Sequence, residues 1–252
     1  MRLSEEPILQ VKNLSFSYPE KKGVLKNINL EVERGERIAV IGPNGSGKTT
    51  LFLLICGVLK PHSGKITAMG EKVEHNRFNP RISYLFQSPD DQLFSSTIFD
   101  DVAFGPLNMG LSRREVERRV QDALEKTGCK ALAERIPHHL SGGEKRMAAI
   151  ASILSMNPEI ILFDEPTSNL DSRNRRKVIN TLNSLSQTIL ASSHDLEFLL
   201  ETCEKVILLD EGEIVKTGSI RAIMGEENLM QSHHLEKPHS LIHSLHIPHS
   251  HG

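Results

Sequence analysis

The chain has 252 residues, a formal net charge of −2 and three widely separated cysteines. This length fits one large domain or two small ones, and it is sufficient for a substantial core. The near-neutral charge provides no global field directed at nucleic acid, and the cysteine pattern favours a reduced cytosolic chain over a disulfide framework. The N-terminus predicts no secretory signal, and the apolar stretch at 51–59 is far shorter than the roughly 20 residues of a spanning helix. Any membrane role should therefore depend on a partner.

The first apolar runs of the chain differ in their pattern. Residues 8–16 alternate partly and residues 28–32 alternate cleanly, with a charged turn at 19–23 between them. This predicts two strands of a small antiparallel sheet with one face in water. Residues 38–41 form a continuous apolar run instead, which predicts a strand buried on both faces.

Buried strands then alternate with helices along the chain. A glycine-rich loop and a predicted helix at 48–59 follow the strand at 38–41. Ser112 and Glu115 have the spacing of a capping box and open a predicted helix that ends near residue 128. A further helix is expected over 141–156, and further strands over 82–86, 160–163, 188–192 and 206–209. This alternation predicts an α/β fold with a mainly parallel core sheet.

The helical pattern between residues 88 and 155 is not interrupted by a strand, which predicts a helical subdomain inserted into the core. We place the main domain at 6–225, with the helical subdomain at about 88–155. The pattern fades after Ile223, and we assign residues 226–252 to a histidine-rich C-terminal tail.

The loop after the strand at 38–41 has the pattern G-x-x-x-x-G-K-[ST] of a phosphate-binding loop. Its glycines allow successive N–H groups to turn inward around an anion, and the helix that follows adds its positive end. In such a loop Lys48 reaches the β- and γ-phosphates, and the Thr49 hydroxyl is a ligand for Mg²⁺. A chance glycine-rich turn is disfavoured by the strand before the loop and the helix after it. The predicted nucleotide-binding residues here are Gly42, Pro43, Asn44, Gly45, Ser46, Gly47, Lys48, Thr49 and Thr50.

Two acids, Asp164 and Glu165, follow the apolar strand at 160–163. A buried strand delivers such residues to the carboxyl edge of the sheet, where ligands bind in open α/β folds. Asp164 is predicted to hold Mg²⁺, and Glu165 to polarise the water that attacks the γ-phosphate. Strands often end in acids, so this pattern gains its weight from the phosphate-binding loop that precedes it.

The segment Leu140-Ser141-Gly142-Gly143-Glu144 predicts a second anion-binding helix N-terminus. An ordinary N-cap with flexible glycines is the alternative. Here the sequence resembles the ABC ATPase family, whose signature is LSGGQ or LSGGE. The resemblance implies that Ser141, Gly142 and Gly143 of one subunit cover the nucleotide of another, so that two subunits close head to tail around two ATP molecules. The second subunit could be an identical copy or a paralogue.

The resemblance extends over roughly residues 6 to 225 and implies further roles. Tyr18 falls where the family stacks an aromatic ring on adenine, and Gln87 matches the Q-loop glutamine that touches Mg²⁺ and the membrane partner. His194 matches the switch histidine beside the γ-phosphate, and Asp171 belongs to the D-loop at the dimer interface. Asn169 replaces the small residue more usual in that loop. The implied catalytic residues are Glu165, His194, Lys48 and Gln87, and the implied magnesium ligands are Thr49, Gln87 and Asp164.

Residues 87–94 and 97–106, with their D-Q-L-F and D-V-A-F-G-P segments, resemble the energy-coupling-factor branch of this family. That branch comprises cobalt and nickel importers and their vitamin-transporting relatives. The resemblance implies a peripheral ATPase at the cytoplasmic face of the cell membrane, with a transmembrane coupling subunit and a substrate-binding membrane subunit as partners. The predicted cargo is cobalt or nickel, and the ATPase of a vitamin-type or other ABC transporter is the alternative. A soluble ABC ATPase acting on nucleic acid is disfavoured, because the chain lacks an inserted coiled coil and a basic stripe.

The predicted tail is rich in histidine, and imidazoles are suitable ligands for nickel, cobalt, copper and zinc. Spacing of i, i+4 and i+7 relates His239, His243 and His246, although Pro238 and Pro248 limit any helix. A disordered polar tail without a specific ligand is the alternative. The histidines concerned are His233, His234, His239, His243, His246, His249 and His251.

Overall fold

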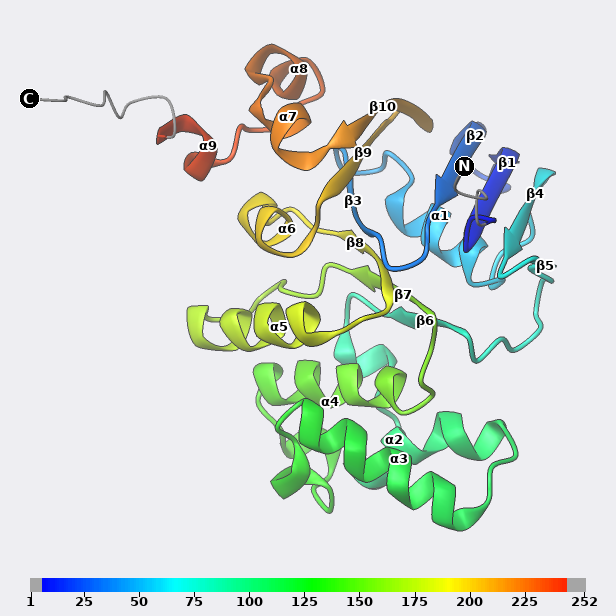
Figure 1. Cartoon of the computed structure of the whole chain (residues 1–252), viewed down its shortest axis with the longest axis vertical. Helices are drawn as coiled ribbons and strands as arrows, with labels where there is room; N and C mark the ends of the chain where they lie inside the picture. The colour runs from blue at the N-terminus through cyan, green and yellow to red at the C-terminus, as the bar shows by residue number, and fades with distance from the viewer. Residues whose placement is uncertain (1–5, 244–252) are drawn as a thin grey trace, which may run out of the picture.

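The computed structural model describes residues 6–243, which form two sheets and a helical region (Figure 1). The smaller sheet is antiparallel and has the strand order β2-β1-β4-β5. Its strands are β1 (Leu9–Phe16), β2 (Leu25–Val32), β4 (Ser63–Ala68) and β5 (Glu71–Lys72). The predicted antiparallel sheet near the N-terminus is therefore confirmed.

The larger sheet has the strand order β10-β9-β3-β8-β7-β6. Five neighbouring strands from β9 to β6 are parallel, and β10 is antiparallel at the edge. The strands are β3 (Arg37–Ile41), β6 (Ile82–Leu85), β7 (Ile160–Asp164), β8 (Thr188–Ser192), β9 (Lys205–Asp210) and β10 (Glu213–Ser219). This confirms the mainly parallel core sheet and places the carboxyl ends of β3, β8, β7 and β6 side by side.

The parallel strands are buried on both faces, as their continuous apolar sequences predict. In β7, Ile160 and Leu162 pack into one cluster, and Ile161 and Phe163 pack into the other. The first cluster also contains α1 (Lys48–Ile55) and the inner face of the antiparallel sheet, so α1 lies between the two sheets (Figure 1). The second cluster joins the core sheet to the remaining helices.

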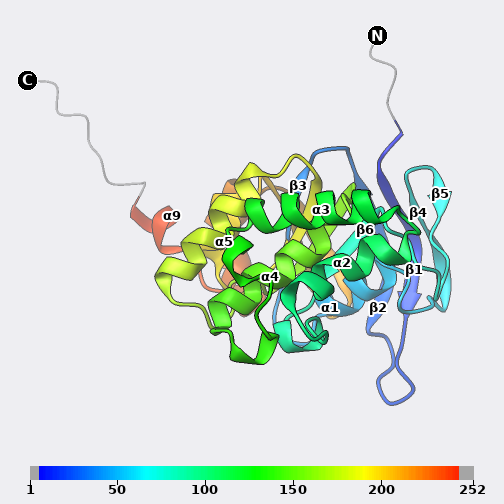
Figure 2. The same cartoon turned by 90° about the horizontal axis from the view of Figure 1, so that it is seen from below.

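The predicted helical subdomain is present between β6 and β7, and this interval contains no strand. Its main helices are α2 (Ile98–Asn108), α3 (Arg113–Lys126) and α4 (Gly142–Leu154), which lie against one another (Figure 2). Short 3₁₀ turns occupy Pro89–Asp91, Lys130–Leu132 and Pro137–His139.

The capping box predicted at Ser112 forms only in part. The Ser112 hydroxyl accepts a hydrogen bond from the Glu115 N–H at 3.4 Å. The Glu115 carboxylate turns away to Arg118 and Arg119, which hold its pKa well below the usual value, at about 2. Two guanidinium partners provide a stronger interaction for a carboxylate than one backbone N–H does. The full capping box lies at the start of α4, where Ser141 and Glu144 bind each other's backbone N–H.

The chain continues through α5 (Ser172–Ser184), α6 (Leu196–Thr202) and α7 (Ile220–Gly225). Two further helices, α8 (Glu227–Ser232) and α9 (His239–His243), lie in the predicted tail. Met230 is fully buried, and Leu235 and Leu241 pack against the core. The described part of the tail is thus folded onto the domain, because a few apolar residues anchor helices too short to show a periodic pattern.

The tail histidines do not form a metal centre within the described residues, where no group of three or more histidine, cysteine or acidic side chains gathers as a metal site would. Nδ1 of His233 lies 2.7 Å from Oδ2 of Asp210, at the end of β9. His246, His249 and His251 lie outside the described residues. The sequence prediction of a metal-binding tail therefore remains a prediction.

Candidate functional site

The candidate site lies at the carboxyl edge of the core sheet, where the loops after four parallel strands meet. The phosphate-binding loop follows β3, Gln87 follows β6, Glu165 follows β7 and His194 follows β8. Together they border a cleft of about 220 Å³. Its lining residues are Tyr18, Lys21, Val24, Asn44, Gly45, Gly47, Lys48, Thr49, Thr50, Gln87, Asp164, Glu165 and His194. The structure thus brings together side chains that are far apart in the sequence.

The phosphate-binding loop turns tightly between β3 and α1. Gly42 has φ 153°, and a Cβ atom added there would lie 1.9 Å from the carbonyl oxygen of Leu209 on the neighbouring strand β9. Only glycine fits this close approach of two backbones. The Pro43 carbonyl accepts the N–H of Ser46, whose hydroxyl is buried and has no hydrogen-bond partner within the described residues. An orphaned donor inside an anion-binding loop fits an anionic ligand.

Lys48 begins α1, and its ammonium group points back into the loop. Its Nζ donates to the carbonyl oxygens of Gly42 at 2.8 Å and of Pro43 at 3.0 Å. Burial lowers the pKa of Lys48 below its usual value, and the negative charges of Glu165 and Asp164 oppose this shift. The positive end of α1 and this ammonium group point into the same loop, which suits a polyphosphate.

Asp164 is 2% exposed and is held by hydroxyl groups on both oxygens. Its Oδ2 accepts hydrogen bonds from the hydroxyls of Thr49 at 2.7 Å and Tyr84 at 2.9 Å. Its Oδ1 accepts one from the hydroxyl of Ser192. Hard oxygen donors in this arrangement fit Mg²⁺, which prefers one or two carboxylates beside phosphate oxygens. Gln87 lines the same cleft, so the three predicted magnesium ligands converge.

Glu165 has the geometry of a general base. Its Oε2 accepts hydrogen bonds from the His194 N–H at 3.2 Å and the Ser193 hydroxyl at 3.3 Å. Its Oε1 is buried without a hydrogen-bond partner among the described residues and lies 3.6 Å from Nε2 of His194. Burial raises the pKa of Glu165, although the contacts with His194 oppose the shift. A buried, incompletely paired carboxylate beside a phosphate-binding loop can orient and deprotonate a water.

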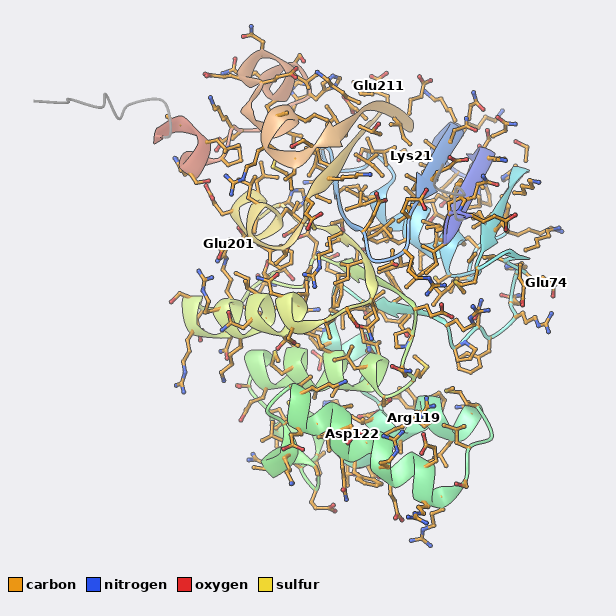
Figure 3. All side chains as sticks on the ribbon, viewed as in Figure 1. Lys21, Glu74, Arg119, Asp122, Glu201 and Glu211 are labelled. Carbon is orange, nitrogen blue, oxygen red and sulfur yellow. The ribbon has the colours of Figure 1, made fainter. Side chains whose placement is uncertain are left out.

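Tyr18 lies at the rim of the cleft, where its ring meets that of Phe16 edge to face at 4.9 Å. Its hydroxyl lies 3.3 Å from the Thr50 hydroxyl. A half-buried aromatic ring beside a phosphate loop provides a stacking surface for a base. Lys21, in the predicted charged turn, lies near Glu211 beside the loop (Figure 3). The Lys21 Nζ lies 3.5 Å from the carbonyl oxygen of Gly45.

The signature residues lie outside this cleft. The Ser141 hydroxyl donates to the Glu144 carboxylate at 2.7 Å, inside the capping box of α4. Gly142 has open space around it, whereas a Cβ atom on Gly143 would lie 2.3 Å from the Asn174 side chain. Asp171 caps α5 by accepting the Asn174 N–H at 2.7 Å. The structure therefore separates Ser141, Gly142, Gly143 and Asp171 from the predicted nucleotide residues of the same chain.

Sequence reasoning missed several residues of the site. Arg146, on α4, is 2% exposed and donates to the carbonyl oxygens of Phe86 at 2.9 Å and Gln87 at 2.6 Å. Burial lowers its pKa to about 10. Arg146 thus fixes the Gln87 loop to the signature helix. The signal available for Arg146 was its place on an otherwise apolar face of the predicted helix at 141–156. For Lys21 there was no such signal, because the sequence does not distinguish it from a solvent-exposed lysine.

A second hollow, of about 540 Å³, lies on the helical subdomain next to Gln87. We name it the aromatic groove, and its exposed rings are Phe78, Phe86, Phe94 and Phe104. Asp101 fixes the loop that carries Phe94, because its Oδ1 accepts the N–H groups of Phe94 and Ser95. No helix within residues 6–243 is long and apolar enough to cross a membrane. Exposed aromatic side chains gathered in a groove indicate a protein partner.

Comparison with known proteins identifies the family. The ABC transporter family matches residues 25–168. The chain belongs to the ABC transporter ATP-binding family. It is 45% identical over 239 residues to the energy-coupling factor transporter ATP-binding protein EcfA of Methanothermobacter thermautotrophicus. The alignment covers 92% of this chain and 77% of EcfA. The chain therefore binds and hydrolyses ATP, as the signature and phosphate-loop motifs predicted.

Two solved structures of the family share the fold. The structure of CbiO1 from Clostridium perfringens, part of the ABC transporter complex CbiONQ, aligns with a TM-score of 0.79 and 35% identity. That alignment covers 90% of this ABC chain and 94% of the other. The dimeric ATP-binding cassette MJ0796, in a post-hydrolysis state bound to ADP and phosphate, aligns with a TM-score of 0.75 and 28% identity. It covers 84% of this chain and 98% of that one.

Proposed function

We propose that this ABC ATPase powers an energy-coupling-factor importer, and that its cargo is cobalt or nickel. The observation that carries the proposal is the aromatic groove beside Gln87. The D-Q-L-F segment supplies Asp91, Gln92 and Phe94 to this groove, and α2 supplies Phe104. The Gln92 amide fixes the segment by donating to the Ala149 carbonyl at 2.9 Å and the Ser152 hydroxyl at 2.8 Å. The similarity to EcfA and to CbiO1 supports this branch of the family.

In this proposal the four loops at the edge of the core sheet have different roles in ATP binding and hydrolysis. Lys48 and the loop N–H groups bind the phosphates, and Tyr18 stacks on the adenine. Thr49, Asp164 and Gln87 hold Mg²⁺, which when bound neutralises charge on the phosphate oxygens. Glu165 accepts a proton from the attacking water, and His194 keeps that carboxylate oriented.

We propose that two subunits close head to tail, so that Ser141, Gly142, Gly143 and Asp171 of one face the nucleotide of the other. The separation of these residues from their own cleft supports this arrangement. The dimeric state of MJ0796 is consistent with it. The second subunit is an identical copy or a paralogue.

The aromatic groove is proposed to receive a helix of a transmembrane coupling subunit. A substrate-binding membrane subunit is the other proposed partner in the complex. The ATPase then lies at the cytoplasmic face of the membrane. Exposed phenylalanines and the acidic rim at Asp91 suit a partner helix that carries apolar and basic side chains. Substitution of Phe104 by Asp should abolish copurification with the membrane subunits, because a charge would enter the centre of the apolar contact.

Uptake of radiolabelled nickel and cobalt tests the cargo. Cells that carry Glu165→Gln should lose uptake of one metal, whereas cells that carry the surface control Glu125→Gln should retain it. Unchanged uptake of both metals in the Glu165→Gln cells would contradict the metal assignment and redirect the search to vitamins. It would leave the assignment of the chain as an ABC ATPase unchanged.

Metal binding by the tail is a separate part of the proposal. Replacement of His239, His243, His246, His249 and His251 by Gln should lower the number of nickel or cobalt ions bound per chain in equilibrium dialysis. His233 is left in place, because its contact with Asp210 belongs to the fold. Equal metal binding by the native and substituted chains would show that the tail is only a polar segment.

A further inference from the structure

One side chain belongs both to the aromatic groove and to the candidate magnesium site. Tyr84 lies on β6, where it pairs with Leu162 of β7, two residues before Asp164. Its ring lines the groove, and its hydroxyl donates to Oδ2 of Asp164 at 2.9 Å. Tyr84 therefore connects the groove to Asp164, which borders the nucleotide cleft.

The contact at the cleft end is a hydrogen bond to a buried charge. Asp164 Oδ2 accepts one hydrogen bond from Thr49, beside the phosphate loop, and one from Tyr84. A phenol is protonated at physiological pH, so the Tyr84 hydroxyl is the donor in this hydrogen bond. Hydrogen bonds from outside the ligand shell fix the orientation of carboxylates that bind metals.

The contact at the groove end is aromatic. The rings of Tyr84 and Phe86 meet edge to face, with centroids 4.8 Å apart. Phe86 is 38% exposed in the groove, so a molecule seated there would touch the ring that packs on Tyr84. Phe94 and Phe104 form a second edge-to-face pair in the same groove, at 5.0 Å.

We propose that Tyr84 is a positioning residue, which orients Asp164 for Mg²⁺ and makes the affinity for the metal depend on packing in the aromatic groove. A merely space-filling role requires the ring alone, whereas this role also requires the hydroxyl. The inference rests on the magnesium site proposed above. Tyr84 lines the groove proposed for the membrane partner, and its hydroxyl contacts the proposed magnesium ligand Asp164.

The test measures nucleotide affinity with and without metal. The dissociation constant of the non-hydrolysable imido analogue of ATP is measured on the purified subunit in excess EDTA and in saturating Mg²⁺. The ratio of the two values reports how strongly metal and nucleotide binding are coupled. For Tyr84→Phe we expect the EDTA value to stay the same and the ratio to fall about tenfold.

The other outcomes overturn the proposal in distinguishable ways. Weakening by the same factor in EDTA and in Mg²⁺ would show that Tyr84 only supports the fold of the cleft. A native ratio in Tyr84→Phe would show that the hydroxyl does not act on the metal. Equal affinities in EDTA and Mg²⁺ for the native protein would overturn the magnesium site itself, and this inference with it.

A matched pair of groove variants tests the contact between the rings of Tyr84 and Phe86. Phe86→Leu removes the ring that packs on Tyr84 and should lower the same ratio about threefold. Phe94→Leu removes a ring from the same groove that pairs with Phe104 instead, and it should leave the ratio at the native value. Equal ratios for the two variants would contradict the connection between Tyr84 packing and the metal.

Discussion

The chain has two helix N-termini built to face an anion, at α1 and at α4, and they differ in what surrounds them. The loop before α1 contains Lys48 and meets Asp164 and Glu165, so the charged groups that the chemistry needs are gathered around it. The start of α4 has an open Gly142 and a serine engaged with Glu144. In the proposed function the first binds the nucleotide of its own subunit, and the second faces the nucleotide of the other subunit.

The largest effect is expected at the first of these regions. Glu165→Gln removes the group that accepts a proton from water, and we expect ATP turnover to fall about 1,000-fold. Nucleotide binding should survive, because the loop and Lys48 are unchanged. Steady-state ATPase assays and equilibrium binding check both expectations, and hydrolysis at the native rate would remove Glu165 from the proposed mechanism.

Lys48→Ala should instead remove binding. The ammonium group lies inside the loop, where it donates to the carbonyl oxygens of Gly42 and Pro43. Its loss should remove the charge-assisted contacts proposed with the β- and γ-phosphates. We expect ATP affinity to fall about 100-fold, measured by titration with a fluorescent nucleotide. A variant that binds ATP as the native chain does would show that Lys48 does not contact the phosphates.

The signature glycines offer a paired test of the second region. Gly143→Ala should destabilise the folded subunit by about 1 kcal/mol, because the new methyl group displaces Asn174 from its hydrogen bond with Asp171. Gly142→Ala should leave the melting temperature unchanged, since, beyond its chain neighbours and its own helix backbone, no atom of residues 6–243 lies within 4 Å of a Cβ added there. It should nevertheless lower the ATPase rate at concentrations where the subunit dimerises. Native ATPase activity for Gly142→Ala would contradict a nucleotide approaching this surface.

An ion pair between α5 and the residue after His194 should show a dependence on pH. Arg175 of α5 binds both oxygens of Asp195, the residue after His194, at 2.5 and 3.1 Å. Burial opposes ionisation of Asp195, but the hydrogen bonds from Arg175 and from the Phe198 N–H outweigh it and lower its pKa below 3.8. The folded state therefore binds this proton less readily than the unfolded state does.

Asp195→Asn should cost about 1–3 kcal/mol of unfolding free energy at neutral pH. The stabilisation by ionised Asp195 is present above its unfolded pKa and is lost as the pH falls through its lower folded pKa. The difference between native and variant proteins should therefore shrink below pH 3.8. Urea titrations across this range measure it, and a difference independent of pH would exclude the ion pair as its source.

Local patterns predicted much of this fold. The strand at 38–41, the phosphate loop and the helix from Lys48 are where the sequence places them, because continuous apolar runs and glycine spacing are local signals. The helices α8 and α9 were not predicted. Each has only five or six residues, so burial of Met230 in α8 and packing of Leu241 in α9 decide their position without a periodic pattern in the sequence.

The sequence by itself determined which residues are predicted to carry the chemistry, since Lys48, Asp164, Glu165 and the signature Ser141 each belong to a short motif with a fixed spacing. Tertiary structure alone decided which of them share a cleft. Parallel pairing brings the ends of β3, β8, β7 and β6 to one edge and leaves Ser141 on another surface. It also decided that Tyr84 touches both Asp164 and the aromatic groove, because this contact depends on the pairing of β6 with β7, two strands that lie far apart in the sequence.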